Sequence, residues 1–168
     1  MFKTVLVNVL ALAVLLAGQQ ARSQDEEPKI SQLSVIDRDF MEDQRLAVDE
    51  RARSALGRQI RGEKNNDLDV LQQLLDRRAV KPEETVLLQG MGVVMGDLLA
   101  AELGMDWVIY EDKLGRSRAL RFGLGDHYLY PVTMISRRYE VGATVDVRAI
   151  YDKAVELMRP HLPPRPFQ

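Results

Sequence analysis

The chain has 168 residues, enough for one domain with a modest core, and its 46% apolar and 29% charged content is that of an ordinary globular protein. The formal net charge of -2 gives no general reason to expect binding to nucleic acid or to an anionic membrane. Cysteine is absent, so neither disulfides nor thiolate metal sites can contribute, and stability must come from packing.

The first residues have the pattern of a secretory signal peptide. A short start containing Lys3 precedes an apolar run over residues 5–17, and this length and these flanks are typical of the hydrophobic region of such a peptide. A spanning helix needs about 20 apolar residues, which argues against a permanent membrane anchor. We assign residues 1–23 to the signal peptide, with cleavage after Ser23 or nearer Ala17. The mature protein is predicted to be exported, with a periplasmic or an extracellular location.

Residues 24–33 are predicted to be an acidic, flexible spacer, because the segment carries charge and proline but has little to bury. The first helix should begin just after it. Ser34 and Asp37 have the spacing of a capping box, and Asp37 or Asp39 are rival caps. Apolar residues at helical spacing continue to Gly57, which should end the helix. The many charged side chains of this helix predict a solvent-exposed face.

A second, short helix follows a connection rich in glycine and asparagine. Leucines recur at helical spacing over residues 68–75, behind Asn66 or Asp67 as the cap. We expect this helix to end at about Arg78.

The third helix is predicted to be central and buried. Pro82 should occupy its first turn, where a proline loses no hydrogen bond. Gly92, Gly96 and Ala100 recur every four residues and therefore share one face. Each helical glycine costs roughly 1 kcal/mol relative to alanine, and close packing against this face is the simplest compensation.

After this helix the apolar period changes from about 3.6 to 2, which indicates strands. Residues 107–110 and 117–122 are predicted to form an antiparallel hairpin across a turn at 111–115. Residues 128–135 offer a third strand, in which Pro131 is tolerable only at an edge or a bulge.

A final helix should follow, capped by Thr144 or Asp146, and residues 160–168 form a proline-rich tail. The predicted fold class is therefore α+β. It has three N-terminal helices, a small antiparallel sheet of about three strands and a C-terminal helix, in a single domain over residues 34–159.

A series of short motifs runs through this domain in a fixed order. They are Gly92-Val-Val-Met-Gly96-Asp-Leu-Leu, Leu103-Gly-Met-Asp-Trp107-Val, Asp112-Lys-Leu-Gly115-Arg, Leu129-Tyr-Pro-Val132 and Ile135-Ser-Arg137-Arg. Their order resembles the bacterial family catalogued as domain of unknown function 3806, over roughly Phe40 to Met158. The resemblance implies a small α+β domain in bacterial proteins, often exported, with no established activity and no site residues to transfer.

Residues with catalytic potential are few. Of the two histidines, His161 lies in the proline-rich tail, so we predict neither a metal site nor a cofactor. Asp126 and His127, with Tyr128 beside them, could form an acid–base site. Adjacent residues of a strand point to opposite faces, however, so a loop or surface role is favoured for His127.

Arginines on or beside the predicted strands form the one constellation that suits a ligand, because guanidinium groups bind carboxylate or phosphate. They are Arg116, Arg118, Arg121, Arg137 and Arg138. The competing interpretation is an ordinary solvated sheet face, balanced by Glu111, Asp112 and Glu140.

Packing signals outnumber catalytic ones, so the predicted function is a binding or protein-interaction module rather than an enzyme. Its partner would be an acidic protein or a small anionic ligand, and nucleic acid is not expected. The alternative is a small hydrolase or transferase with a site around His127 and the arginines. The sequence leaves the oligomeric state open.

Overall fold

The computed structural model describes residues 27–162, so the predicted signal peptide at 1–23 and most of the predicted tail lie outside the described residues. The elements follow one another in chain order. They are β1 (Lys29–Gln32), α1 (Val35–Leu56), α2 (Lys64–Asp76), α3 (Thr85–Leu103), β2 (Asp106–Asp112), β3 (Gly115–Arg121), β4 (Tyr128–Leu129), the 3-10 turn η1 (Pro131–Thr133), α4 (Ser136–Tyr139), α5 (Val147–Met158) and the 3-10 turn η2 (Arg159–His161).

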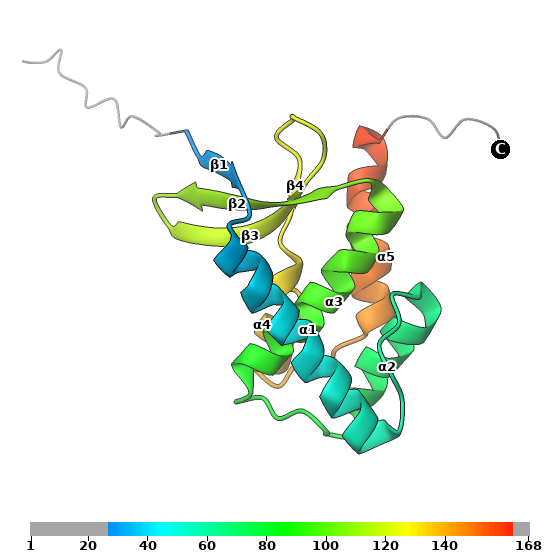
Figure 1. Ribbon diagram of the computed structural model, residues 1–168. Coiled ribbons are helices and arrows are strands. Elements are labelled where there is room, and N and C mark those ends of the chain that lie inside the picture. The colour runs from blue at the N-terminus through cyan, green and yellow to red at the C-terminus, as the bar shows by residue number, and fades with distance from the viewer. Residues whose placement is uncertain (1–26, 163–168) are drawn as a thin grey trace, which may run out of the picture.

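The four strands form one antiparallel sheet in the order β1-β2-β3-β4. Figure 1 shows the sheet at one end of the molecule, with α1 descending from β1 and α3 running through the middle between α1 and α5. The predicted α+β class is confirmed. The sheet has one strand more than the sequence indicates.

The additional strand is β1, which lies in the segment predicted to be a flexible spacer. Its residues pair antiparallel with β2, with Ile30 opposite Tyr110 and Gln32 opposite Val108. The spacer prediction is therefore wrong for 29–32. The segment has little apolar surface of its own, and its order comes from main-chain pairing with an open strand edge, which no local pattern reveals.

The capping box predicted at the start of α1 is confirmed. Asp37 N–H donates to Ser34 Oγ at 3.1 Å, and the Asp37 carboxylate accepts from Ser34 N–H at 3.1 Å. The prediction that the charged side chains of α1 form a solvent-exposed face is only partly correct. Arg45 of α1 donates to Asp97 of α3 at 2.6 Å, and Arg51 pairs with Glu84 at 2.7 Å.

Two predicted helix starts are displaced. α2 begins at Lys64 with Glu63 at its cap, and Asp67 instead lies in the first turn, where its carboxylate accepts the N–H groups of Arg61 and Gly62 at 2.9 and 2.8 Å. α3 begins at Thr85, so Pro82 precedes the helix in a turn. The Glu84 carboxylate likewise accepts the N–H of Lys81 at 2.8 Å. In both segments a carboxylate binds loop N–H groups, which orders the chain before the first helical residue.

The small-residue face of α3 packs as closely as the sequence predicts. A Cβ placed on Gly96 would lie 2.4 Å from the Trp107 ring, and one on Gly92 would lie 2.5 Å from the carbonyl oxygen of Pro131. By length and composition α3 could also cross a membrane, but 61% of its apolar window is buried inside the protein. This burial is what a central core helix requires.

The β2–β3 hairpin is confirmed, with Asp112 opposite Gly115 across its turn. The predicted third strand over 128–135 is correct only for β4, because the chain then turns into η1 and α4. Pro131 has no N–H with which to extend the ladder. As a result, β3 has a paired neighbour on its β4 side only at Leu120 and Arg121.

The cap of α5 is Asp146, whose Oδ1 accepts from Ala149 N–H at 2.8 Å. Residues 159–161 form η2, so the predicted tail is wrong at 160–161, and residues 163–168 lie outside the described residues. Tyr151 of α5 is fully buried, and its hydroxyl donates to Glu102 at 2.7 Å. These contacts fix α5 against α3.

Candidate functional site

A hollow of about 560 Å³ lies where the open part of β3 faces η1 and α4. Its lining brings together guanidinium, hydroxyl and amide groups from five elements, α3, β2, β3, η1 and α4, and from the loops between them. The lining residues are Gln89, Tyr110, Asp112, Leu114, Gly115, Arg116, Ser117, Arg118, Tyr130, Val132, Thr133 and Arg137. Three of the five arginines singled out from the sequence therefore share one surface.

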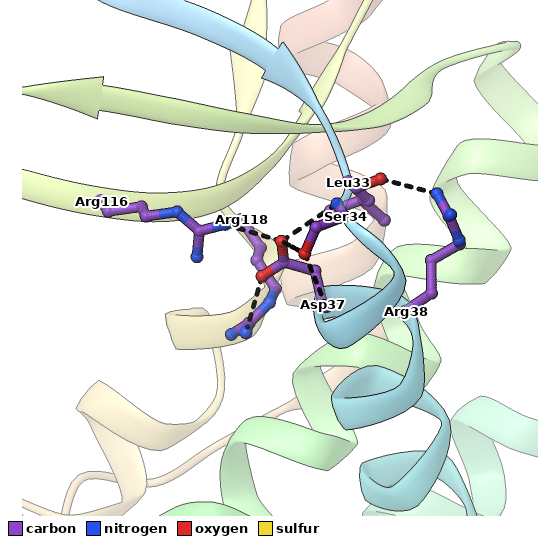
Figure 2. Close-up of polar contacts among 6 residues, drawn as sticks. All are labelled: Leu33, Ser34, Asp37, Arg38, Arg116 and Arg118. Atoms are coloured by element: carbon purple, nitrogen blue, oxygen red, sulfur yellow. Dashed lines mark hydrogen bonds and ion pairs between the residues drawn. The ribbon is translucent and has the colours of Figure 1, made fainter.

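Two of these arginines are held by a single buried carboxylate. Asp37 of α1 accepts from Arg116 at 2.6 Å and from Arg118 at 3.1 Å, and Figure 2 shows it lying between the two side chains of β3. The Asp37 side chain is only 4% exposed, against 47% for Arg116. The hydrogen bond from Arg116 is the main cause that holds the pKa of Asp37 well below its usual range. Asp37 is therefore ionised and orients both guanidinium groups.

Arg118 retains hydrogen-bonding capacity beyond this pair. Its Nε is buried and has no hydrogen-bond partner among the described residues. Its guanidinium carbon lies 4.7 Å from the centre of the Phe40 ring, a cation–π contact that fixes the group from a second side. Arg118 is therefore held in place while its Nε–H remains available to donate a hydrogen bond.

Arg137 and Arg138 lie on α4, not beside a strand as predicted. The Arg138 guanidinium donates to the carbonyl oxygen of Met134 in its own turn. Arg137 is exposed at the hollow, and within residues 27–162 no hydrogen bond or ion pair holds its guanidinium. The two neighbouring arginines therefore differ in their availability to a ligand.

The remaining predicted site residues lie elsewhere. Arg121 donates to the carbonyl oxygens of Leu124 and Gly125, which closes the loop after β3. His127 stacks on His161 with ring centroids 3.6 Å apart, and the neighbouring Asp126 is exposed. Among residues 27–162, His127 therefore has an aromatic neighbour and no acidic partner of an acid–base pair.

Tyr128 belongs to a cluster of aromatic rings. Its ring meets Tyr110 edge-on at 5.1 Å, and Tyr130 meets Tyr110 edge-on at 5.7 Å. Burial raises the pKa of Tyr130 to about 12, so its hydroxyl stays protonated at neutral pH and can donate a hydrogen bond. Tyr110 and Tyr130 therefore give the hollow an aromatic wall with a polar edge.

This arrangement suits an anionic ligand. Three carboxylates lie near these guanidinium groups: Asp37 beneath Arg116 and Arg118, Asp112 at the rim, and Glu111 opposite Arg116 across the β2–β3 pair. Within residues 27–162, however, no hydrogen bond or ion pair holds the Arg137 guanidinium, so it is available to a ligand. Arginine donors are directional and match carboxylate or phosphate oxygens. Among residues 27–162 no group of three His, Asp or Glu side chains could hold a metal ion.

Sequence reasoning missed the residue that organises the site. Asp37 was recognised only as a helix cap, and its partner Arg116 is 79 residues further along the chain. Gln89, Tyr110 and Tyr130 were also missed, since each belongs to an apolar or turn pattern. The alternating arginines of β3 were the only local signal.

Fold and site together define a small α+β domain that presents an arginine-lined hollow beside an open strand. A family model described as a domain of unknown function (DUF3806) matches residues 67–151, about half of the chain. The chain belongs to this family, as the motif order indicates. All residues lining the hollow fall inside the match, whereas Asp37 lies outside it.

A solved structure with a similar fold comes from Bacteroides thetaiotaomicron VPI-5482, determined at 1.50 Å resolution. It superimposes with a TM-score of 0.70 over 80% of this chain and 50% of that one, at 15% sequence identity. At this identity the likeness shows the fold alone, and our chain spans half the length of that protein. No curated protein matches the chain.

Proposed function

We propose that this protein is an exported, periplasmic binding module that recognises carboxylate-bearing ligands, above all acidic protein segments, through the hollow beside β3. The observation that carries the proposal is the convergence of Arg116, Arg118 and Arg137 on one hollow of about 560 Å³. Two of these groups are oriented by Asp37, and the third has no internal partner among the described residues.

The physical argument rests on preorganisation. A guanidinium held in place before binding loses less side-chain entropy when a ligand arrives than one that is free. Asp37 holds Arg116 and Arg118 in this way, while the Arg137 guanidinium has no hydrogen bond or ion pair within the described residues. A carboxylate in the hollow would therefore meet fixed donors from β3 and the unpaired guanidinium of Arg137.

Arg137→Ala is expected to weaken binding of a fluorescently labelled oligoglutamate peptide by about tenfold to a hundredfold, because one charge-assisted hydrogen bond is worth about 1.5–3 kcal/mol. Fluorescence polarisation at low ionic strength measures this change, and an oligoglutamine peptide of equal length controls for charge. The fold should be unaffected, since Arg137 is exposed and holds no other described element.

Arg138→Ala is the matched control. It removes the same charge from the same turn, but its guanidinium is occupied by the Met134 carbonyl oxygen. Binding should therefore remain close to that of the unaltered protein. Equal losses in the two variants would show a nonspecific effect of net charge and contradict the proposed site.

The exported location rests on the N-terminal pattern, a charged start followed by an apolar run over residues 5–17. Intact-mass analysis of protein recovered from a periplasmic extract should find a mature chain that begins within the segment 18–24. A chain that retains Met1 and stays in the cytoplasmic fraction would contradict export.

A further inference from the structure

The main chain of β3 has an open edge that faces the hollow. In an antiparallel strand the N–H and C=O of one residue point to the same side, and this side alternates along the strand. Leu120 pairs with Leu129 of β4, and Phe122 N–H donates to the His127 carbonyl oxygen at 3.1 Å. The main-chain N–H and C=O groups of even-numbered β3 residues, including Arg116 and Arg118, therefore point away from β2.

No described main-chain group pairs with this part of the edge. β4 ends at Leu129, and Pro131, the next residue that could continue the ladder opposite Arg118, has no N–H. Among residues 27–162, no backbone hydrogen bond outside regular elements reaches Arg116 or Arg118. The N–H and C=O groups of both residues are thus directed at the hollow, which their side chains also line.

We infer that the ligand of this site is an extended acidic polypeptide segment of a partner protein, which adds to the sheet as a strand beside β3. The inference rests on the proposed function and specifies the form of its ligand. Addition of a peptide strand to an open sheet edge uses main-chain hydrogen bonds for affinity and alternate side chains for specificity. The open stretch from Gly115 to Ala119 could hold a strand of about 17 Å, at about 3.4 Å for each residue.

The charges of the edge select the sequence of the added strand. Arg116 and Arg118 lie opposite Glu111 and Ile109 of β2, so both side chains emerge on the same face of the sheet. Side chains at every second position of an added strand would lie beside them on that face. Acidic residues alternating with apolar ones should therefore bind better than the same residues in an order that places no two acidic residues two positions apart.

The free edge of β1 offers the same kind of main-chain groups without this charge pattern. Lys29 and Ser31 face β2, so Ile30 and Gln32 present their N–H groups outward. Neither side chain attracts an acidic partner. The edge of β3 is the one that combines open main-chain groups with a cationic lining.

Two capped peptides of identical composition test the pattern: Glu-Val-Glu-Val-Glu-Val, and Glu-Glu-Val-Val-Glu-Val, in which no two glutamates are two positions apart and only one can therefore lie beside Arg116 or Arg118 at a time. We expect the alternating peptide to bind the full chain about tenfold more tightly, as each misplaced carboxylate forfeits a charge-assisted hydrogen bond. Alternate residues of the added strand direct their N–H groups toward β3, and the residues between them direct theirs away. Methylating the backbone nitrogens of the first set should abolish binding, and methylating those of the second set should leave it unchanged. Equal affinities, or equal effects of methylating the two sets, would overturn the inference.

Amide hydrogen exchange identifies the edge directly. On addition of the alternating peptide, exchange at Arg116 and Arg118 should slow, while Ser117 and Ala119, already directed at β2, should not change. Ile30 and Gln32 on the edge of β1 provide the control and should also stay unchanged.

The results of these experiments distinguish the proposed binding function from strand addition at β3. Binding that is lost in Arg137→Ala but leaves the exchange of Arg116 and Arg118 unaltered would retain the proposed function and overturn strand addition. Binding of neither peptide, at concentrations up to the millimolar range, would overturn both. Protection of Ile30 and Gln32 in place of Arg116 and Arg118 would place the partner on β1 and overturn the inference.

Discussion

Gly96→Leu is expected to destabilise the protein by about 3 kcal/mol or more, which is a large share of the typical 5–15 kcal/mol stability of a domain. A Cβ on Gly96 would lie 2.4 Å from Trp107 Cζ2 and 3.0 Å from the Pro131 Cβ, and the remaining atoms of leucine have no room beyond it. The gain in helix propensity, about 1 kcal/mol, is smaller than this overpacking cost. Chemical denaturation followed by the fluorescence of Trp107, the single tryptophan, measures the loss.

Ala101→Leu on the same helix is the control, because Ala101 is exposed and a larger side chain there meets solvent. Its effect should stay within about 0.5 kcal/mol. The contact itself can be tested in a double variant with Trp107→Ala, which removes the ring that blocks the site. Because the two residues touch, we expect a favourable coupling of about 1–3 kcal/mol. Strict additivity would show that Gly96 is required for a different reason.

The helices could largely be predicted from the sequence because their signals are local. Ser34 and Asp37 lie three residues apart, and the glycines of α3 repeat at one helical period, so each pattern is complete within a few turns. Positions that depend on a distant partner were predicted less well. β1 is ordered by β2, about 80 residues away, and the start of α3 is moved by carboxylate bonds that fix the preceding turn.

The candidate site shows the same division. The sequence shows five arginines on or beside predicted strands as a candidate ligand surface, and the structure places Arg116 and Arg118 two residues apart on β3, on one face of the sheet. Their common counterion, Asp37, belongs to another element, so no spacing rule could connect them. Pro131 was read as a tolerated edge residue, whereas it ends β4 and leaves β3 open, which is what forms the hollow.

Asp37→Asn is expected to destabilise the protein by about 2–4 kcal/mol at neutral pH, because removing one partner of a buried ion pair leaves the others uncompensated. Asp37 is 4% exposed at the side chain and accepts from Arg116, Arg118 and Ser34. Asparagine keeps one oxygen acceptor but loses the charge. Asp39→Asn, at the exposed rival cap two residues later, should change stability by no more than about 0.5 kcal/mol.

The loss of stability in Asp37→Asn should depend on pH, and this dependence shows whether the charge of Asp37 is its cause. The pKa of Asp37 is lowered in the folded state, chiefly by the Arg116 hydrogen bond, relative to about 3.9 in the unfolded chain. Its stabilisation is therefore fully present above about pH 4 and is lost as the pH falls further toward the folded value. Glu84, whose pKa Arg51 lowers to about 2, titrates over a similar range in both proteins and cancels from the comparison. Urea denaturation measures the unfolding free energy of the unaltered protein and of Asp37→Asn between pH 7 and pH 3. The difference between them should be constant down to about pH 4 and become smaller below it. A gap that stayed constant to pH 3 would assign the loss to the shape of the side chain instead of its charge.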